Sequence, residues 1–231
     1  MAIKTLAFDT GGTILDWHKG ISSALARAGA ARGLTADWSA VTNEYRRRSL
    51  KGIVNADRPA FNFDDVHREK LDEVIKEFRL EALTAADRDA IWRTWHALDA
   101  WPDFPATLAR LRKRYVCASF TLLTTSLVID VSRKNGISWD AIISCEMIGL
   151  YKVRPEAYLT AAKWLQLDPA EILMVACHNF DLDAARGCGF QTAFVRRPDE
   201  WGPAGPPDPN PNPACTYVVD GFPELAEKLG A

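Results

Sequence analysis

The sequence lacks any apolar run long enough to span a bilayer, and its first residues lead into a strand-like run rather than a signal peptide. It also lacks a charge excess, because 28 basic and 30 acidic residues give a formal net charge of -2 at pH 7. Membranes and nucleic acids bind through apolar or strongly basic surfaces. We therefore expect neither as a partner.

Cysteine is scarce and shows no paired spacing, at positions 117, 145, 177, 188 and 215. An odd number of cysteines cannot all pair within one chain, which argues against a disulfide framework. Reduced thiols are typical of a reducing compartment. Cysteine usage therefore predicts a cytoplasmic protein.

A short apolar run at residues 3–8 is typical of a buried strand. Asp9 follows it directly, and Gly11 and Gly12 behind it favour a tight turn. In open α/β sheets, ligands bind in the crevice beyond the carboxyl ends of the strands. Asp9 is therefore the first candidate functional residue.

Residues 17–100 have a different character from this opening stretch, since they are long, charged and helix-periodic with no strand pattern. Apolar residues recur at helical spacing in segments that begin near Trp17, Trp38, Asp64 and Thr84. The last segment starts with a sequence close to a capping box. We predict an all-helical insert.

From Pro102 onward, apolar strand patterns alternate with helical ones. Such alternation predicts an α/β fold with a mostly parallel sheet and helices on both faces. Residues 1–16 and 101–231 then form the core, and residues 17–100 form a cap. Strands are expected at 116–120, 141–144, 172–175 and 191–195, and helices at 105–115, 124–135, 155–165, 181–187 and 223–229. Residues 198–213, dense in proline and glycine, predict a semi-rigid surface loop.

Polar residues follow several of the predicted strands, at ends that face one edge of the sheet. A carboxylate, a hydroxyl, a cation and a second carboxylate converge there from distant parts of the chain. Such convergence indicates a catalytic site more strongly than any single short motif does. The candidates are Asp9, Thr10, Thr121, Lys152, His178, Asn179 and Asp181.

The motifs FDTGGT, YKVRPEAY and MVACHNFDLDAARGCGF, with Thr121 between the first two, resemble the haloacid dehalogenase superfamily. The resemblance is closest to its type II 2-haloacid dehalogenase branch and covers nearly the whole chain. It implies a Rossmann-like core, a helical cap at residues 17–100 and an active site closed between the two. It also implies no cofactor and no metal, and suggests a homodimer because relatives are often dimers.

The resemblance assigns the catalytic roles. Asp9 would attack the carbon that bears the leaving group, with inversion, and form an ester. Lys152 would keep Asp9 ionised and help to bind the substrate carboxylate. Asp181 would direct the water that cleaves the ester, although it could also cap the helix expected at 181–187. Tyr158 would support the lysine and the carboxylates.

The remaining candidates would bind substrate. Thr10 and Asn179 flank the catalytic residues, and Thr121 would hold a carboxylate oxygen. Relatives follow this threonine with Asn-Gly, whereas this chain has Leu122-Leu123, which predicts a more apolar pocket wall. His178 would lie beside the leaving halide, or else be a hydrogen-bonded structural histidine. A Cys–His nucleophile with the preceding cysteine is not expected, since adjacent residues in a strand point to opposite sides.

Gly11 separates the two main reaction classes of the superfamily. Phosphatases carry a second aspartate there to protonate a leaving alcohol, and a Gly-Asp that binds magnesium where this chain has Ala176-Cys177. Halide needs no proton to leave, so both absences favour attack at carbon in a short 2-haloacid, with fluoroacetate within range. A Mg-dependent small-molecule phosphatase and a catalytically weak binding protein are the alternatives.

The cap offers no clear halide-binding arginine. Relatives carry one in a Trp-Arg pattern before a tyrosine, and residues 40–45 of this chain contain none. Arg46, Arg48 or Arg58 could take its place, although a solvated side chain is the expectation for any one of them. His67 and Trp95 are further cap candidates, with core packing expected for Trp95.

Overall fold

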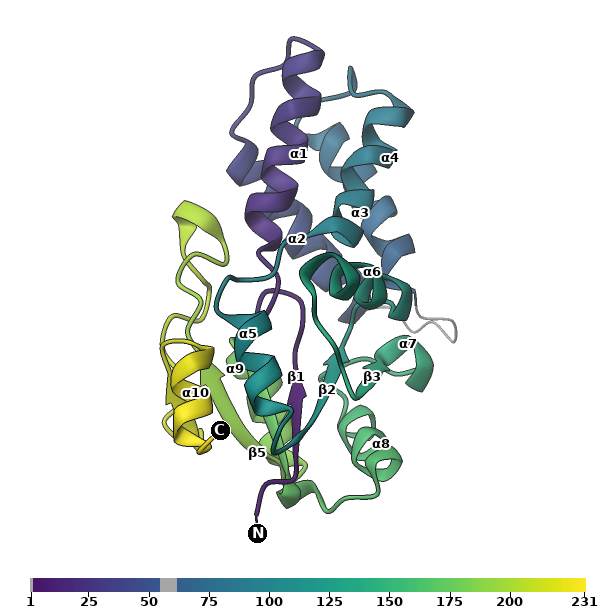
Figure 1. The fold of residues 1–231 in the computed structure, drawn as a ribbon. Coiled ribbons are helices and arrows are strands. Elements are labelled where there is room, and N and C mark those ends of the chain that lie inside the picture. The colour runs from purple at the N-terminus through teal and green to yellow at the C-terminus, as the bar shows by residue number, and fades with distance from the viewer. Residues whose placement is uncertain (1, 55–61) are drawn as a thin grey trace.

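The computed structural model describes residues 2–54 and 62–231. It consists of a sheet with flanking helices and, at the carboxyl ends of its strands, a group of helices inserted after the first strand (Figure 1). Within the described residues, no helix is long and apolar enough to cross a membrane.

The sheet runs in the order β3-β2-β1-β4-β5-β6, and every neighbouring pair is parallel. The central strand β1 is buried at every position, as expected of a strand with helices on both faces. The predicted α/β core with a mostly parallel sheet is therefore confirmed. The strands are β1 (Thr5–Phe8), β2 (Val116–Thr121), β3 (Ala141–Ser144), β4 (Ile172–Ala176), β5 (Gln191–Val195) and β6 (Tyr217–Val219).

The core helices cover the sheet in two sets. Contacts join α5 to α10 and, separately, α8 to α9, and α6 contacts β3. From β1 the strand order extends through β2 to β3 on one side and through β4 to β6 on the other. Because crossovers between parallel strands are right-handed, the helices that connect the strands on the two sides lie on opposite faces of the sheet. The bounds are α5 (Phe104–Leu111), α6 (Thr125–Asn135), α7 (Cys145–Ile148), α8 (Pro155–Leu165), α9 (Asn179–Gly187) and α10 (Phe222–Lys228), with short 3₁₀ turns η2 (Pro169–Glu171) and η3 (Gly202–Ala204).

Local sequence signals set many of these ends. Thr124 caps α6 by accepting a bond from the Leu127 amide, and Gly136 ends it in the left-handed region at φ 63°. Pro155 opens α8 at its first turn. The helix expected at 181–187 begins two residues earlier, and neither α7 nor β6 was expected, because such short elements carry little periodicity.

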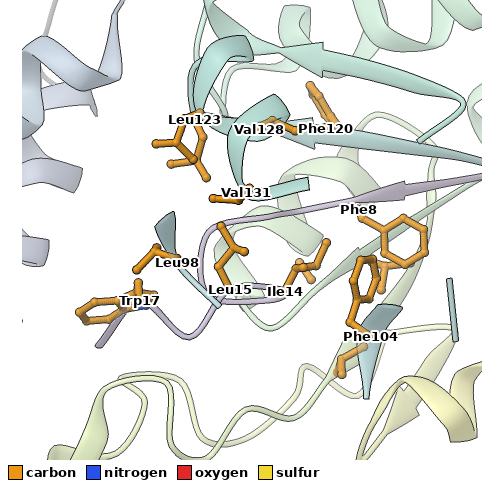
Figure 2. Packing of buried hydrophobic residues seen from close by; sticks show 14 of the residues in the cluster. Phe8, Ile14, Leu15, Trp17, Leu98, Phe104, Phe120, Leu123, Val128 and Val131 are labelled. Carbon is orange, nitrogen blue, oxygen red and sulfur yellow. The ribbon is translucent and has the colours of Figure 1, made fainter. Parts of the chain in front are cut away.

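An aromatic cluster forms the core on one face of the sheet. The Phe8 ring meets Phe104 edge-on at 5.5 Å between centroids, and Phe104 lies 4.7 Å from Phe222. Figure 2 shows the packing continue from Phe8 and Phe104 towards Leu15 and Trp17, where the inserted helices begin. The hydrophobic core therefore continues from the sheet to the start of the inserted helices.

The inserted helices are joined to the core by two neighbouring chain segments. Leu15 pairs with Ala100 in an antiparallel bridge, and the Trp101 amide donates to the Ile14 carbonyl at 2.8 Å. We propose that residues 17–100 are the cap and that residues 1–16 with 101–231 are the core. The cap contains α1 (Trp17–Ala31), α2 (Trp38–Val54), α3 (Phe63–Glu77), α4 (Ala85–Arg93) and the 3₁₀ turn η1 (Thr94–Ala97), with the expected capping box at Thr84 and Asp87.

Candidate active site

A cavity of about 60 Å³ lies where the carboxyl ends of β1, β2 and β4 face the inserted helices. The Asp9 amide donates to the Val175 carbonyl at 2.9 Å, so the carboxylate stands directly beyond β1. Residues from every predicted strand end, from α2 and from the loop after β5 surround this space. They include Asp9, Gly11, Arg46, Thr121, Leu122, Leu123, Lys152, His178, Phe180, Asp181, Glu200 and Trp201.

Lys152 joins the two predicted catalytic carboxylates. Its Nζ donates to Asp9 Oδ1 at 3.2 Å and to Asp181 Oδ2 at 2.7 Å, and the lysine side chain is only 1% exposed. Burial by itself raises the pKa of Asp9, but Lys152, His178 and Thr13 together hold it well below its usual range. Asp9 is therefore ionised at neutral pH, as a carboxylate nucleophile must be.

Asp181 sits inside α9 rather than at its cap. The helix begins at Asn179, and the Asp181 carboxylate points instead to Lys152 and to the Tyr158 hydroxyl, which donates to Oδ1 at 2.6 Å. The capping alternative is therefore wrong. Burial raises the pKa of Asp181 despite the neighbouring ammonium, which makes it a stronger base than an exposed aspartate.

Thr13, the last residue of the FDTGGT motif, is a site residue for which the sequence predicted no role. Its hydroxyl donates to Asp9 Oδ2 at 2.8 Å and accepts the Cys177 amide at 3.0 Å, so it ties the nucleophile to the end of β4. The Thr10 hydroxyl instead bonds Ser119 between β1 and β2. Asn179 holds the loop at Asn210, outside the cavity lining. The side chains of Thr10 and Asn179 do not reach the cavity.

Leu122 and Leu123 form part of the cavity wall beside Thr121, whose hydroxyl accepts the Leu123 amide at 3.1 Å. This agrees with the apolar wall expected from the sequence. His67 and Trp95 lie deep among the inserted helices, stacked with ring centroids 4.1 Å apart. Burial lowers the pKa of His67 well below its ordinary value, so it is neutral and belongs to the core of the insert.

His178 lies between two carboxylates. Its Nδ1 is 3.5 Å from Asp9 Oδ2, and its Nε2 is 3.0 Å from Glu200 Oε1. Glu200 is fully buried and was not predicted, since it lies in the proline-rich loop outside every motif. Burial of the ring opposes its charge, but the neighbouring carboxylates of Glu200 and Asp9 raise the pKa of His178 well above its ordinary value.

Arg46, on the inserted helix α2, is buried at the cavity although the sequence predicted a solvated side chain. It is 4% exposed, lines the cavity, and lies 5.5 Å from the Trp17 ring and 5.4 Å from the Trp95 ring. Among the described residues, its Nε and Nη1 have no hydrogen-bond partner. A buried guanidinium with unpaired N–H groups is costly unless an anion completes it. The expectation of a solvated side chain is therefore wrong for Arg46.

The other two arginines differ from Arg46. Arg48 is half-buried and donates to Glu44 at 2.8 Å, with Glu77 as a further partner. Arg58 lies outside the described residues. Of the arginines considered from the sequence, Arg46 alone among those described lines the cavity.

Cys177, His178 and Glu200 form the group within residues 2–54 and 62–231 that could hold a metal ion. Both side chains of the Cys177–His178 pair turn the same way past the strand end, with Sγ 3.4 Å from Nε2, contrary to our expectation. Burial raises the pKa of the Cys177 thiol to about 11, so at neutral pH the thiol is protonated and is not a nucleophile. Hydrogen bonds already join the three side chains, and metal independence stays a prediction.

Comparison with known proteins agrees with this architecture. The family model for haloacid dehalogenase-like hydrolases matches residues 3–189 of the chain. The (S)-2-haloacid dehalogenase of Xanthobacter autotrophicus is 30% identical over 201 residues, which cover 84% of this chain and 76% of that protein. The crystal structure of a defluorinating L-2-haloacid dehalogenase is 35% identical, with a TM-score of 0.91 over 99% of this chain and 96% of that one. Another L-2-haloacid dehalogenase structure is 31% identical, with a TM-score of 0.90 over 99% and 100%.

Fold and site together define an α/β hydrolase with helices inserted after its first strand and a buried aspartate at the end of that strand. The chain belongs to the haloacid dehalogenase-like hydrolases, in the branch that holds the (S)-2-haloacid dehalogenases.

Proposed function

We propose that the protein hydrolyses the carbon–halogen bond of short 2-haloacids, without a metal, through an ester on Asp9. One observation carries the proposal: an ionised Asp9 held by Lys152 faces a small cavity, and the residue two places on is Gly11 rather than an acid. Displacement at carbon needs a carboxylate nucleophile and a leaving group that departs without a proton. Asp9 provides the nucleophile, and the lack of an acid at Gly11 suits a leaving group that needs no proton.

The reaction has two steps. In the first, an Asp9 oxygen attacks the α-carbon from the side opposite the halogen, and halide leaves with the bonding electron pair and inversion at carbon. In the second, water attacks the Asp9 carbonyl carbon, and Asp181, with its raised pKa, accepts the proton. Lys152 and the Thr13 hydroxyl, which hold the carboxylate oxygens, stabilise charge on the tetrahedral intermediate. A 2-hydroxy acid is released, and one oxygen of Asp9 now comes from water.

The cavity favours the smallest substrates. A water needs roughly 10–15 Å³ on this measure, so about 60 Å³ accommodates a two-carbon haloacid with little space left. Leu122 and Leu123 close one wall, and Phe180 and Trp201 stand between the cavity and a wider opening. We infer that haloacetates, fluoroacetate included, are better substrates than longer 2-haloacids.

Arg46 supplies the anion site that substrate or departing halide would occupy. We expect Arg46→Met to lower kcat/KM for haloacetates by about 10²–10³, the scale of losing a buried charge-assisted contact worth about 3–4 kcal/mol. The matched control is Arg27→Met, because Arg27 is exposed on α1 and does not line the cavity or its opening. Steady-state halide release measures both variants. Equal losses in the two would contradict an anion site at Arg46.

The decisive experiment is a halide-release screen with chloroacetate, bromoacetate and fluoroacetate in the presence of EDTA, with (S)-2-chloropropionate added to test inversion. We expect release of each halide and formation of (R)-lactate from the last substrate. Turnover of p-nitrophenyl phosphate that needs Mg²⁺ and vanishes with EDTA would instead establish the phosphatase alternative. Binding without any turnover, unchanged in Asp9→Asn, would establish the binding-protein alternative.

Cytoplasmic location and homodimer formation stay predictions. All five cysteines are unpaired, which is compatible with a reducing compartment. Size-exclusion chromatography with light scattering measures the oligomeric state directly.

A further inference from the structure

The two oxygens of the Asp9 carboxylate have different partners. Lys152, which lines the cavity, donates to Oδ1 at 3.2 Å. At Oδ2 the Thr13 hydroxyl donates at 2.8 Å from outside the cavity lining, and His178 Nδ1 lies 3.5 Å away. An oxygen that faces two donors has less electron density free for attack than an oxygen that faces one. The geometry therefore favours Oδ1 as the attacking atom and leaves Oδ2 as the carbonyl oxygen of the ester.

Hydrolysis of that ester places negative charge on Oδ2. When water adds to the carbonyl carbon, the electron pair of the C=O bond moves onto this oxygen, and donors that are already aimed at it stabilise the charge. Thr13 and His178 both lie at Oδ2 before any substrate arrives. They are placed as an oxyanion site for the second step of the reaction.

A buried carboxylate holds His178 from its other side. Nε2 lies 3.0 Å from Oε1 of Glu200, which is 1% exposed and also accepts the indole N–H of Trp17 at 3.0 Å. Gly12, in the turn that follows Asp9, adopts φ 99°, and a Cβ there would collide with the same carboxylate. Glycine accepts this left-handed conformation and leaves room for the contact. The turn that carries the nucleophile is therefore shaped around Glu200.

The two steps of the reaction make different demands on Glu200. Before attack, both Asp9 and Glu200 balance the charge of the His178 imidazolium. In the ester Asp9 has lost its charge, so of these two carboxylates Glu200 is the one that still balances it. A neutral imidazole has one N–H, whereas the imidazolium donates to both neighbours, and its charge-assisted hydrogen bonds are stronger. Glu200 therefore matters most when charge develops on Oδ2.

We propose that Glu200 is a positioning residue for ester hydrolysis: it holds the His178 imidazolium so that Nδ1–H, together with the Thr13 hydroxyl, stabilises the oxyanion at Oδ2 of Asp9. This role rests on the proposed function and concerns its second step.

The step balances in atoms and charge. Water adds to the carbonyl carbon while Asp181 accepts one of its protons, and the C=O electron pair goes to Oδ2. That pair re-forms the C=O bond as the bond from the carbonyl carbon to Oδ1 breaks. Asp181 returns its proton to Oδ1, which leaves as the hydroxyl oxygen of the product. The regenerated Asp9 carboxyl loses its remaining proton to solvent.

The two steps are measured separately in a single turnover of bromoacetate with protein in excess. Bromide release follows alkylation of Asp9, and mass spectrometry of the acid-quenched protein follows the ester through its added carboxymethyl group. A carboxylate that only holds the fold together would affect both steps alike. A loss confined to the second step is the signature of a residue that acts on the oxyanion.

We expect Glu200→Gln, which keeps the shape of the side chain, to slow ester hydrolysis about 100-fold, within the range for losing one oxyanion donor. Alkylation should slow less than about tenfold, so ester should accumulate on Asp9 above its wild-type level. His178→Gln should behave in the same way, and the double variant should lose little more, because Glu200 acts through His178. Asp199→Asn, the exposed neighbour, is the matched control and should match the wild type.

Ester that stays at its wild-type level in Glu200→Gln, equal slowing of both steps, or additive losses in the double variant would overturn this role and leave the proposed function intact. Wild-type protein that releases no halide would instead remove the proposed function and this role with it. If circular dichroism shows that Glu200→Gln is unfolded, the same measurement in His178→Gln decides, and equal slowing of both steps there overturns the proposal.

Discussion

Replacing Asp9 by asparagine is expected to lower halide release from every haloacid by at least about four orders of magnitude, the scale on which loss of a covalent nucleophile acts. The amide is a poor nucleophile and cannot form the ester. Lys152 would retain Asp181 as a buried partner at 2.7 Å, so the fold should survive and the loss should lie in the chemical step. Binding of the haloacid should remain measurable.

Ion chromatography of released halide measures this loss, and isotope labelling identifies the atom responsible. In single turnover in H₂¹⁸O, wild-type protein should incorporate ¹⁸O into the peptide that contains Asp9, while Asp9→Asn should not. Asp183→Asn is the matched control, because Asp183 lies on α9 outside the cavity lining. Label found in the product alone from the first turnover would show that water attacks the substrate directly.

The strand ends of the core were predictable because local signals and long-range order agree there. Apolar runs gave β3, α8 and β5 the bounds they have in the structure. Parallel strands share one carboxyl edge, so Asp9, Lys152 and Asp181 could be expected to meet from positions far apart in the chain. The distances of 3.2 and 2.7 Å now show which atoms meet.

The sequence offers Arg46 only as one of three possible replacements for the halide-binding arginine, because the run of arginines around it favours a solvated face. Successive helix residues are 100° apart, so at most one or two of such a run can point inward. The signal was present in the spacing: the apolar residues Leu50 and Ile53 follow Arg46 by about one and two helical turns, on the same face of the helix. Glu200 offered no comparable signal, because tertiary contacts alone bring its loop to Trp17 and His178.

Arg46 and Glu200 contribute one positive and one negative charge to the site. Asp9, Asp181 and Glu200 are balanced in the described part of the site by Lys152, His178 and Arg46 (all lining the same cavity). An incoming haloacid would bring one further negative charge, and the proposed alkylation of Asp9 would pass that aspartate's charge to the halide without changing the total. The cations therefore keep partners throughout the first step, which a site with an exposed or absent Arg46 would not provide.

Replacing Lys152 by methionine should cause the largest combined loss of activity and stability. The ammonium lies between Asp9 and Asp181, 4.7 Å from the Phe120 ring. Without it, two buried carboxylates lose the cation they share, which costs about 3–5 kcal/mol. For a chain of this length that corresponds to a fall in Tm of roughly 6–20 °C. Halide release should fall about 10³–10⁴-fold, because Asp9 is neither aimed nor held ionised.

The pH dependence should change sign in this variant. In the wild type the pKa of Asp9 is below its unfolded value near 4, so its stabilisation is present above about pH 4 and is lost as pH falls through the lowered pKa. Without Lys152, burial dominates and raises the pKa of Asp9 above that value, although His178 offsets part of the rise. Asp9 would then stabilise the variant in acid and lose that contribution as pH rises through the new pKa.

Thermal melts of both proteins across pH, together with pH profiles of halide release, measure these effects. The two proteins should differ least in acid and most near neutrality, and the residual activity of the variant should rise with pH as Asp9 ionises. Lys163→Met is the matched control, since Lys163 is exposed on α8 and should leave both profiles unchanged. A Lys152→Met protein that melted like this control at pH 7 would contradict the shared-cation arrangement, because two buried carboxylates cannot both stay ionised without a cation between them.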